Sequence, residues 1–272
     1  MTAIARALDR ATQALKKSSD TPRLDAELLM AHSLGIERDT LLLSKQEGAA
    51  PMAFAGFIER RKDGEPVAYI TGKRAFWNIE LEVGPGALVP RPDSETLIAA
   101  AVEHFAGTPG PKRILDLGTG PGTLLLAALD QWPKATGIGV DSSDEALGYA
   151  RRNAKRLGLA ERAHFKRGDW AKGISESFDL VLINPPYVAV GEELGPGVAE
   201  YEPAEALFAG EQGLAEYRRL APEIGRLLAA GGLAAVEIGH EQDRAVGEIL
   251  KEHGLKPRLA RDLAGRPRAM LI

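Results

Sequence analysis

Asp116-Leu117-Gly118-Thr119-Gly120-Pro121-Gly122 is the stretch that decides the fold class of this 272-residue chain. It closes an apolar, strand-like segment at 113–117 and opens a helical pattern at 123–129. A strand, a glycine-rich turn and a helix in this order are typical of Rossmann-like α/β domains, in which glycines let the backbone approach a nucleotide-like ligand. A dinucleotide fingerprint needs its third glycine three residues after the second, but that position is Thr123 here. The spacing therefore disfavours a nicotinamide oxidoreductase.

A G-x-G-x-G run preceded by an acid resembles the loop with which class I methyltransferases bind S-adenosylmethionine. This ligand has an amino-acid tail and no phosphate, so an acid near the first glycine favours binding. The next strand-like segment, 136–140, ends in Asp141, which can accept both hydroxyls of a ribose. A helix cap is the alternative role, but Ser142, Ser143 and Asp144 already supply capping side chains. We therefore expect Asp141 to bind ligand.

Two further segments follow strand-like runs. Trp170 comes shortly after the run 163–167 and could frame an adenine, although a Trp packed on a helix is the alternative. Residues 184–187 follow the apolar run 178–183. In open α/β sheets, ligands bind at the carboxyl ends of the parallel strands. We expect these segments, the glycine run and Asp141 to meet at that edge.

Asn184, Pro185, Pro186 and Tyr187 indicate the chemistry. A planar –NH2 group is a poor nucleophile because its lone pair is delocalised, so an enzyme that methylates it must position it. The side-chain oxygen of Asn184 and the carbonyl of Pro185 can accept hydrogen bonds from the two N–H groups, and Tyr187 offers a flat face. An ordinary polar turn is the alternative, and the tetrapeptide alone does not choose between adenine and glutamine.

Alternating strands and helices from residue 113 onward predict a seven-stranded, mostly parallel sheet in which a late hairpin inserts one antiparallel strand. The expected strands are 113–117, 136–140, 163–167, 178–183, 233–238, 257–261 and 269–272. The expected domains are a helical substrate-recognition domain at 1–74, a β-hairpin linker at 75–90 and a methyltransferase domain at 91–272.

Two local expectations concern the connecting segments. The linker is predicted to turn at 84–86 and return as a strand at 88–89, and the helix that follows is predicted to be capped by Asp93. The stretch 188–208 is rich in Gly, Pro and Glu. Because it directly follows residues 184–187, we expect it to form a wall or lid over the substrate, with a mobile surface loop as the alternative.

Composition restricts the class of protein. The chain has no cysteine, and its five histidines show no close pairing, so we predict no disulfide, thiol nucleophile or metal site. A net charge of −4 argues against a nucleic acid substrate, whose phosphates basic side chains would have to neutralise. The N-terminus does not resemble a signal peptide, and no apolar run is long enough to span a bilayer. We expect a cytoplasmic enzyme without a membrane partner.

The chain resembles the HemK/PrmC family, the protein-(glutamine-N5) methyltransferases that modify class I peptide chain release factors. The segments that carry the resemblance are 64–72, 89–95, 114–122, 184–187, 201–203, 237–242 and 262–265. The segment 90–92, Pro-Arg-Pro, is specific to this family. Two departures are Pro121, where Ser or Thr is common, and Ser94, where Thr is usual. Pro121 removes one backbone N–H donor from the glycine run.

The resemblance implies how the cofactor, S-adenosylmethionine, would bind. Residues 118–122 would hold its methionine part, Asp141 its ribose and Trp170 its adenine region. Asn184 would border the cofactor as well as the substrate. S-adenosylhomocysteine would be the product.

The resemblance also implies the substrate, the glutamine of a Gly-Gly-Gln loop in a class I release factor. Asn184 would accept one hydrogen bond from the glutamine –NH2 and Pro185 a second, while Pro186 and Tyr187 would shape the pocket. Catalysis would come from positioning and amide polarisation, without a general acid–base pair. We expect a monomer.

Other functions remain open from the residues alone. An adenine-amino methyltransferase would use the same residues 184–187, but the acidic charge and the lack of a dedicated DNA-recognition domain count against it. A glutamine methyltransferase of a ribosomal protein is separated mainly by the N-terminal domain and by segment 90–92. A non-catalytic binder that retains the cofactor fold is a further alternative, because fold alone does not establish function.

Overall fold

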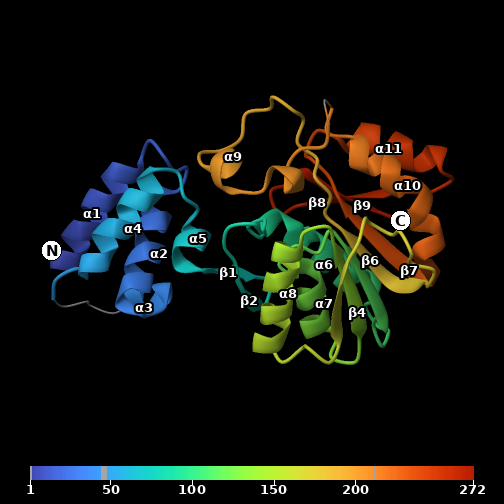
Figure 1. Cartoon of the computed structure of the whole chain (residues 1–272), viewed down its shortest axis with the longest axis horizontal. Coiled ribbons are helices and arrows are strands. Elements are labelled where there is room, and N and C mark those ends of the chain that lie inside the picture. The colour runs from blue at the N-terminus through green and yellow to red at the C-terminus, as the bar shows by residue number, and fades with distance from the viewer. Residues whose placement is uncertain (1, 44–47, 211) are drawn as a thin grey trace. The chain divides into compact units, whose positions relative to one another are not determined.

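The computed structural model describes residues 2–43, 48–210 and 212–272. The chain divides into two compact units, one of residues 1–73 with 193–202 and the other of residues 74–192 with 203–272. Figure 1 shows their elements in chain order. The first unit is therefore discontinuous, because a short segment from the second half of the chain packs with the N-terminal helices.

The first unit is helical. Its N-terminal helices are α1 (Ala3–Leu15), α2 (Pro22–Leu34), α3 (Arg38–Leu43), α4 (Met52–Lys62) and α5 (Val67–Thr71). The hydroxyl of Thr2 begins α1 by accepting a hydrogen bond from the backbone of Ala5 at 3.2 Å, and Gly35 ends α2 with a φ of 66°. Apolar residues of α1 at helical spacing are buried against α2 and α4. The predicted helical character of this region is confirmed.

The segment 193–202 joins this unit through two glycines. Helix α9 (Val198–Tyr201) follows Gly197, whose φ is 80°. A Cβ on Gly64 would lie 3.1 Å from the Cα of Gly197, and a Cβ on Gly197 would collide with the carbonyl oxygen of Gly64. The hydroxyl of Tyr201 also donates to the carbonyl of Asp63 at 3.4 Å. The segment and the N-terminal helices therefore meet backbone to backbone.

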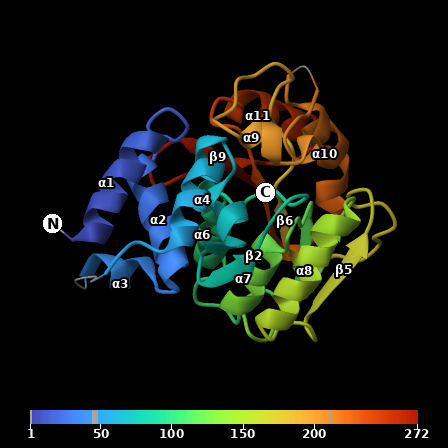
Figure 2. The same cartoon turned by 60° about the vertical axis from the view of Figure 1, so that its left-hand side comes forward.

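The second unit opens with a short hairpin. Strands β1 (Lys73–Phe76) and β2 (Ile79–Glu82) pair with each other, and the chain reverses at Trp77, which has a φ of 53°. Figure 2 shows β2 beside α7 (Thr123–Gln131) and α8 (Asp144–Arg156).

The predicted turn at 84–86 is confirmed, because the N–H of Ala87 donates to the carbonyl oxygen of Gly84 at 3.2 Å, but the predicted return strand at 88–89 was wrong, since these residues lie in no strand. Gly84 and Gly86 also allow close packing. A Cβ on Gly84 would collide with the hydroxyl of Tyr149, and one on Gly86 would collide with the carboxyl of Glu145. Both partners lie on α8, so these glycines allow the chain to run against that helix.

The predicted seven-stranded sheet is confirmed. Its order is β5-β4-β3-β6-β7-β9-β8, and all neighbours are parallel except those of β9. The strands are β3 (Arg113–Leu117), β4 (Thr136–Asp141), β5 (Ala163–Arg167), β6 (Phe178–Ile183), β7 (Leu228–Glu237), β8 (Arg258–Arg261) and β9 (Pro267–Leu271). The antiparallel strand β9 enters between β7 and β8, as the late hairpin predicts.

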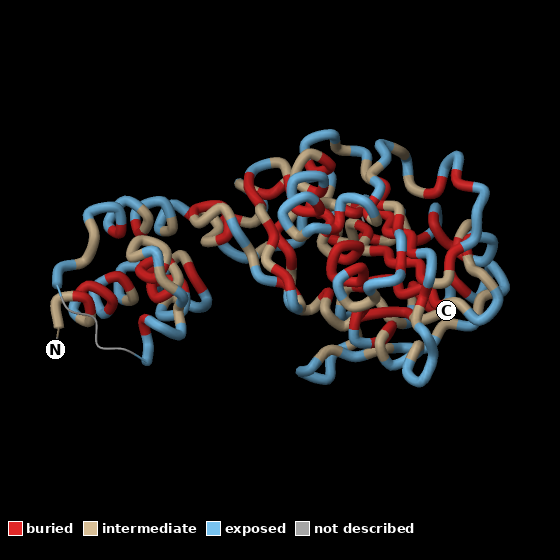
Figure 3. Tube along the Cα trace, turned by 90° about the horizontal axis from the view of Figure 1, so that it is seen from below, coloured by how far each residue is buried: buried red, intermediate tan, exposed pale blue. Residues whose placement is uncertain are grey.

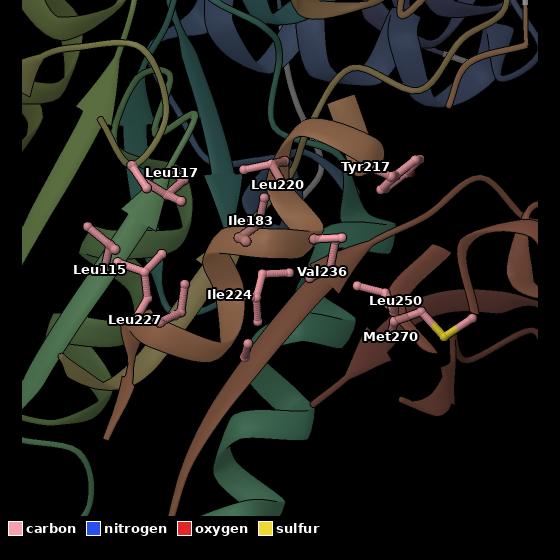
Figure 4. Packing of buried hydrophobic residues seen from close by; sticks show 14 of the residues in the cluster. Leu115, Leu117, Ile183, Tyr217, Leu220, Ile224, Leu227, Val236, Leu250 and Met270 are labelled. Atoms are coloured by element: carbon pink, nitrogen blue, oxygen red, sulfur yellow. The ribbon is translucent and has the colours of Figure 1, made fainter. Parts of the chain in front are cut away.

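Helices cover both faces of the sheet. Besides α7 and α8 they are α6 (Glu95–His104), α10 (Ala215–Leu227) and α11 (Asp243–Glu252), with short 3-10 turns η1 (Pro92–Ser94) and η2 (Ala204–Ala206). Figure 4 shows Leu220, Ile224 and Leu227 of α10 packed on sheet residues such as Leu115 and Val236. Figure 3 shows buried segments gathered in the interior and exposed segments on the outside, and the residues of β3, β6 and β7 are among those that are buried. This apolar core holds the carboxyl ends of the strands in place.

Asp93 does not cap α6, contrary to the prediction. Its carboxylate pairs with the guanidinium of Arg268 at 2.8 Å, and α6 begins without a side-chain cap. Arg268 lies on β9 and is buried. A buried guanidinium requires a charged partner, so Asp93 is drawn from the helix terminus to the ion pair.

Candidate functional site

A cavity of about 340 Å³ lies at the carboxyl edge of the sheet, within the second unit. The candidate residues that line it are Gly118, Thr119, Gly120, Pro121, Asp141, Trp170, Asn184 and Pro186. Gly122, Pro185 and Tyr187 do not line it. The structure thus brings together residues that follow β3, β4, β5 and β6 around one space.

The glycine run forms the floor of the turn between β3 and α7. Gly118, Gly120 and Gly122 have φ values of 73°, 56° and 88°, a conformation that side chains with a Cβ rarely adopt. A Cβ on Gly118 would lie 3.1 Å from the ring of Trp170 and 3.4 Å from the carbonyl oxygen of Asn184. Gly118 is therefore required both by the backbone turn and by the close approach of its neighbours.

The buried side chain of Asp116 stabilises this loop through hydrogen bonds. Its Oδ2 accepts hydrogen bonds from the hydroxyl of Thr119 at 2.6 Å and from the backbone of Leu125 at 3.1 Å. The carboxyl is fully buried, and its Oδ1 has no hydrogen-bond partner among the described residues. Burial raises the pKa of Asp116 from 3.8 to about 7. Asp116 therefore organises the loop from the interior of the second unit.

Asp141 ties the glycine run to the next strand. Its Oδ2 accepts a hydrogen bond from the backbone N–H of Gly120 at 2.8 Å, and its Oδ1 accepts one from the backbone N–H of Ser143 at 2.9 Å. The side chain of Ser143 caps α8, because its hydroxyl accepts a hydrogen bond from the backbone N–H of Ala146 at 3.1 Å. Burial raises the pKa of Asp141. Each carboxylate oxygen can accept a second hydrogen bond, so the side chain can still bind hydroxyls in the cavity.

Trp170 is held by charged residues of α10. Its indole N–H donates to Glu216 at 2.6 Å, and Arg219 bridges Glu216 at 2.8 Å and Asp169 at 2.7 Å. The φ of Trp170 is 49°, which turns the ring toward Gly118. Glu216 and Arg219 also line the cavity, and nothing in their helical segment pointed to this role. These contacts fix the plane of the ring beside the glycine turn.

Asn184 is oriented by a residue that precedes α6. Its Nδ2 donates to the hydroxyl of Ser94 at 3.3 Å. Because the nitrogen and oxygen of an amide point in different directions, Oδ1 is turned away from Ser94 and can accept a hydrogen bond elsewhere. Ser94 is buried, and it too lines the cavity. Its only signal in the sequence was its place in the Pro-Arg-Pro-containing segment.

Tyr187 lies below the cavity. Its hydroxyl donates to Oε1 of Glu237 at 3.2 Å, and burial together with the nearby charge of Glu237 raises its pKa. The ring packs against the core beneath the sheet edge. Tyr187 therefore packs on the core and does not line the cavity, whereas Pro186 does.

The stretch 188–208 is divided between the two units. An isolated bridge joins Val188 and Phe208, and residues 193–202 belong to the helical unit. Pro203, Glu205 and Phe208 line the cavity. Both ends of this stretch thus belong to the unit that carries the site.

The described residues contain no group of three histidine or acidic side chains placed to hold a metal ion. Across the same residues, no helix combines the length and the apolarity that crossing a bilayer demands.

Comparison with known proteins gives matches over nearly the whole chain. Residues 6–72 match the family described as PrmC N-terminal domain, and residues 110–252 match the family described as methyltransferase domain. The chain is 42% identical to the release factor glutamine methyltransferase of Rhodospirillum rubrum, over 98% of this chain and 84% of that protein. It is also 42% identical to the protein of that name from Caulobacter vibrioides, over 93% of this chain and 89% of that protein.

Solved structures show the same architecture. The ribosomal protein L11 methylase of Lactobacillus delbrueckii subsp. bulgaricus superposes with a TM-score of 0.51 at 20% identity, over 70% of this chain and 83% of that one. A methyltransferase from Pyrococcus furiosus gives 0.52 at 19% identity, over 70% and 86%. At this level of identity the likeness shows the fold alone.

Proposed function

The chain belongs to the release factor glutamine methyltransferase family, and from this premise we propose that it transfers a methyl group from S-adenosylmethionine to a glutamine side chain of a release factor. The observation that carries the proposal is the orientation of Asn184. Ser94 holds its amide nitrogen, so its oxygen can accept from an –NH2 group at the cavity that the glycine run also lines.

The residues around the cavity fit the cofactor. The turn 118–122 leaves room for a ligand where side chains would fill it, and Asp116 keeps an unpartnered oxygen beneath this turn. Asp141 would accept from the ribose hydroxyls, and Trp170 would face the adenine. The bound cofactor would supply an electrophilic methyl group.

The protein's own contribution is to position the target amide. Asn184 would accept one N–H of the glutamine and the carbonyl of Pro185 the other, which holds the nitrogen in line with the methyl group. Formation of the new N–CH3 bond and loss of the S–CH3 bond would leave the amide nitrogen positively charged and therefore acidic, so it would lose a proton afterwards and no strong base would be required beforehand. Tyr187, from behind, would keep Pro186 and the pocket wall in place.

The finer identity of the substrate is part of the same proposal. We expect the glutamine of a Gly-Gly-Gln loop in a class I release factor, with the helical unit contacting the rest of that partner. Such a substrate would place the reaction in the cytoplasm, where translation terminates. We expect the enzyme to act as a monomer.

The test is incubation of the protein with radiolabelled S-adenosylmethionine and, separately, purified class I release factor, a ribosomal protein mixture or DNA. We expect label on the release factor, and its loss when the glutamine of the Gly-Gly-Gln loop is changed to Ala. Label on ribosomal protein or DNA alone, or on no substrate, would refute the proposal.

A further inference from the structure

Glu237 is a buried carboxyl that the mechanism above does not use. It ends β7 and is fully buried next to the end of β6, where residues 184–187 begin. Oε1 accepts the hydroxyl of Tyr187 at 3.2 Å, whereas Oε2 has no hydrogen-bond partner among the described residues. Burial raises its pKa to about 7, although hydrogen bonding from Ser94 and the charge of Arg268 oppose this.

The same carboxyl is connected to Asn184 through Ser94. The hydroxyl of Ser94 accepts a hydrogen bond from Asn184 at 3.3 Å, and it lies near enough to Glu237 to lower the pKa of that carboxyl. A hydroxyl that accepts a hydrogen bond from an amide N–H can still donate its own proton, and a nearby carboxylate can accept that hydrogen bond. Glu237 therefore borders both functional side chains of the tetrapeptide, one directly and one through Ser94.

The charge of the buried Arg268 favours the ionised form of Glu237, but the guanidinium forms its ion pair with Asp93 at 2.8 Å. An acid with an unpartnered oxygen in the core lowers the stability of the fold, and an apolar side chain of similar size would pack there without this cost. Orientation of polar neighbours is what the carboxyl adds.

We propose that Glu237 is a positioning residue for the target amide. It holds the ring of Tyr187 directly and the amide of Asn184 through Ser94, so that the Asn184 oxygen stays turned toward the substrate. This inference rests on the proposed function of the cavity.

The test compares two variants of the carboxyl with a matched control. Glu237→Gln keeps the size but loses the charge, and Glu237→Leu removes all polarity. We expect both to lower kcat for release factor methylation roughly 10- to 100-fold, because small displacements of a positioned group are costly. The Kd for S-adenosylmethionine and the KM for release factor should change less than about twofold, since the cavity itself is intact.

Tyr217→Phe is the control. The hydroxyl of Tyr217 lies 3.0 Å from the main-chain oxygen of Glu237 and 3.3 Å from Oε1 of Gln242, so this variant removes buried polar contacts beside Glu237 without touching its carboxyl. We expect its kcat to equal that of the wild type. A loss of kcat in Tyr217→Phe as large as that in Glu237→Gln would mean that general loosening explains both, and would overturn the proposal.

A double variant tests the direct link. If Glu237 acts through Tyr187, Tyr187→Phe combined with Glu237→Gln should lose less kcat than the product of the two single losses. Fully multiplicative losses would contradict the link. The wild-type assay separates the two levels of inference. Without methylation by the wild type the proposed function fails, whereas an active wild type with an equally active Glu237→Gln refutes only the positioning role.

Discussion

Asp116 carries an ionisable group into the interior beneath the glycine turn. Its pKa is raised from 3.8 to about 7 by burial. Between those values the folded protein binds a proton that the unfolded chain has lost, so stability from this group is present at low pH and disappears as pH rises through about 7. Burial also raises the pKa of Glu237, so its contribution to stability likewise falls as the pH rises.

Asp116→Asn should therefore flatten the pH dependence of stability. We expect the free energy of unfolding of the wild type to fall between about pH 4 and 7, and that of the variant to fall less steeply, because Glu237 still titrates. Urea unfolding across this range measures both slopes. Parallel slopes in the two proteins would show that Asp116 does not titrate there.

Asn184→Ala should separate chemistry from cofactor binding. The variant loses the acceptor for the target amide but leaves the glycine turn, Asp141 and Trp170 in place. We expect turnover to fall at least ~100-fold, the usual effect of removing one preorganised polar contact, while the Kd for S-adenosylmethionine changes by less than about threefold. Turnover assays and calorimetry provide the two values. An equal loss in both would contradict this division.

The sequence predicted where the functional residues that follow strands would lie. It did not predict the side chains that hold them in place. Asp141 and Asn184 stand directly after apolar runs, which places them at the ligand-binding edge. Ser94, Glu216 and Glu237 reach the site from distant parts of the chain. Only the folded structure brings such side chains within hydrogen-bonding distance, since no periodic pattern records the pairing.

Among the elements, α10 links the cofactor site to the sheet. It packs its apolar face on the core and presents Glu216 to the indole of Trp170. We expect Glu216→Ala to weaken binding of S-adenosylmethionine by about tenfold, because a hydrogen bond to a charged group is worth roughly 1.5 kcal/mol or more.

Glu223→Ala is the control for this variant. Glu223 lies on the same helix and pairs with Arg226 at the same spacing as Glu216 with Arg219. It does not line the cavity. Its replacement should leave cofactor affinity unchanged in the same calorimetric experiment. Equal weakening in both variants would assign the effect to the helix rather than to Trp170.

The glycine turn gives a second prediction at the scale of elements. Gly118→Ala should lower cofactor affinity, because the new methyl group would press on Trp170 at a backbone φ of 73°. Gly158→Ala shares the strain, with a φ of 71°, but meets nothing within 4 Å. Both should lose about 1 kcal/mol of stability or more, and only Gly118→Ala should raise the Kd. Calorimetry and thermal unfolding distinguish a site effect from common strain.

The strands and most helices could be predicted because their apolar periodicity is local. The return strand at 88–89 could not, because the turn at 84–86 leads into a segment that packs on helix α8 instead of pairing as a strand. Composition indicates that glycine is needed without recording which neighbour the backbone must approach.

At the scale of the whole molecule, the polypeptide passes between the two units three times, after residues 73, 192 and 202. The stretch 188–208 therefore has ends in the cavity unit and a middle in the helical unit. The sequence suggested a wall or lid over the substrate. Two glycines that meet through their backbones leave no pattern from which this division could be deduced.

Gly197→Ala should release the middle of that stretch. The added Cβ collides with the carbonyl oxygen of Gly64. We expect proteolysis within 193–202 to accelerate at least ~10-fold, as for a segment whose local opening is favoured, with cofactor affinity unchanged. Gly191→Ala, with a φ of 90° and nothing within 4 Å, is the control and should remain resistant. Equal cleavage of both variants would show that backbone strain alone loosens the loop.

The discontinuous helical unit also limits how the protein can be dissected. A fragment cut at residue 73 would keep residues 193–202 while losing the helices they pack against, and the complementary N-terminal fragment would lack part of its own surface. Neither piece coincides with one of the two compact units. The gene segment for either half is therefore poorly suited to transfer by recombination, and a faithful isolated catalytic unit would need the loop shortened between residues 192 and 203.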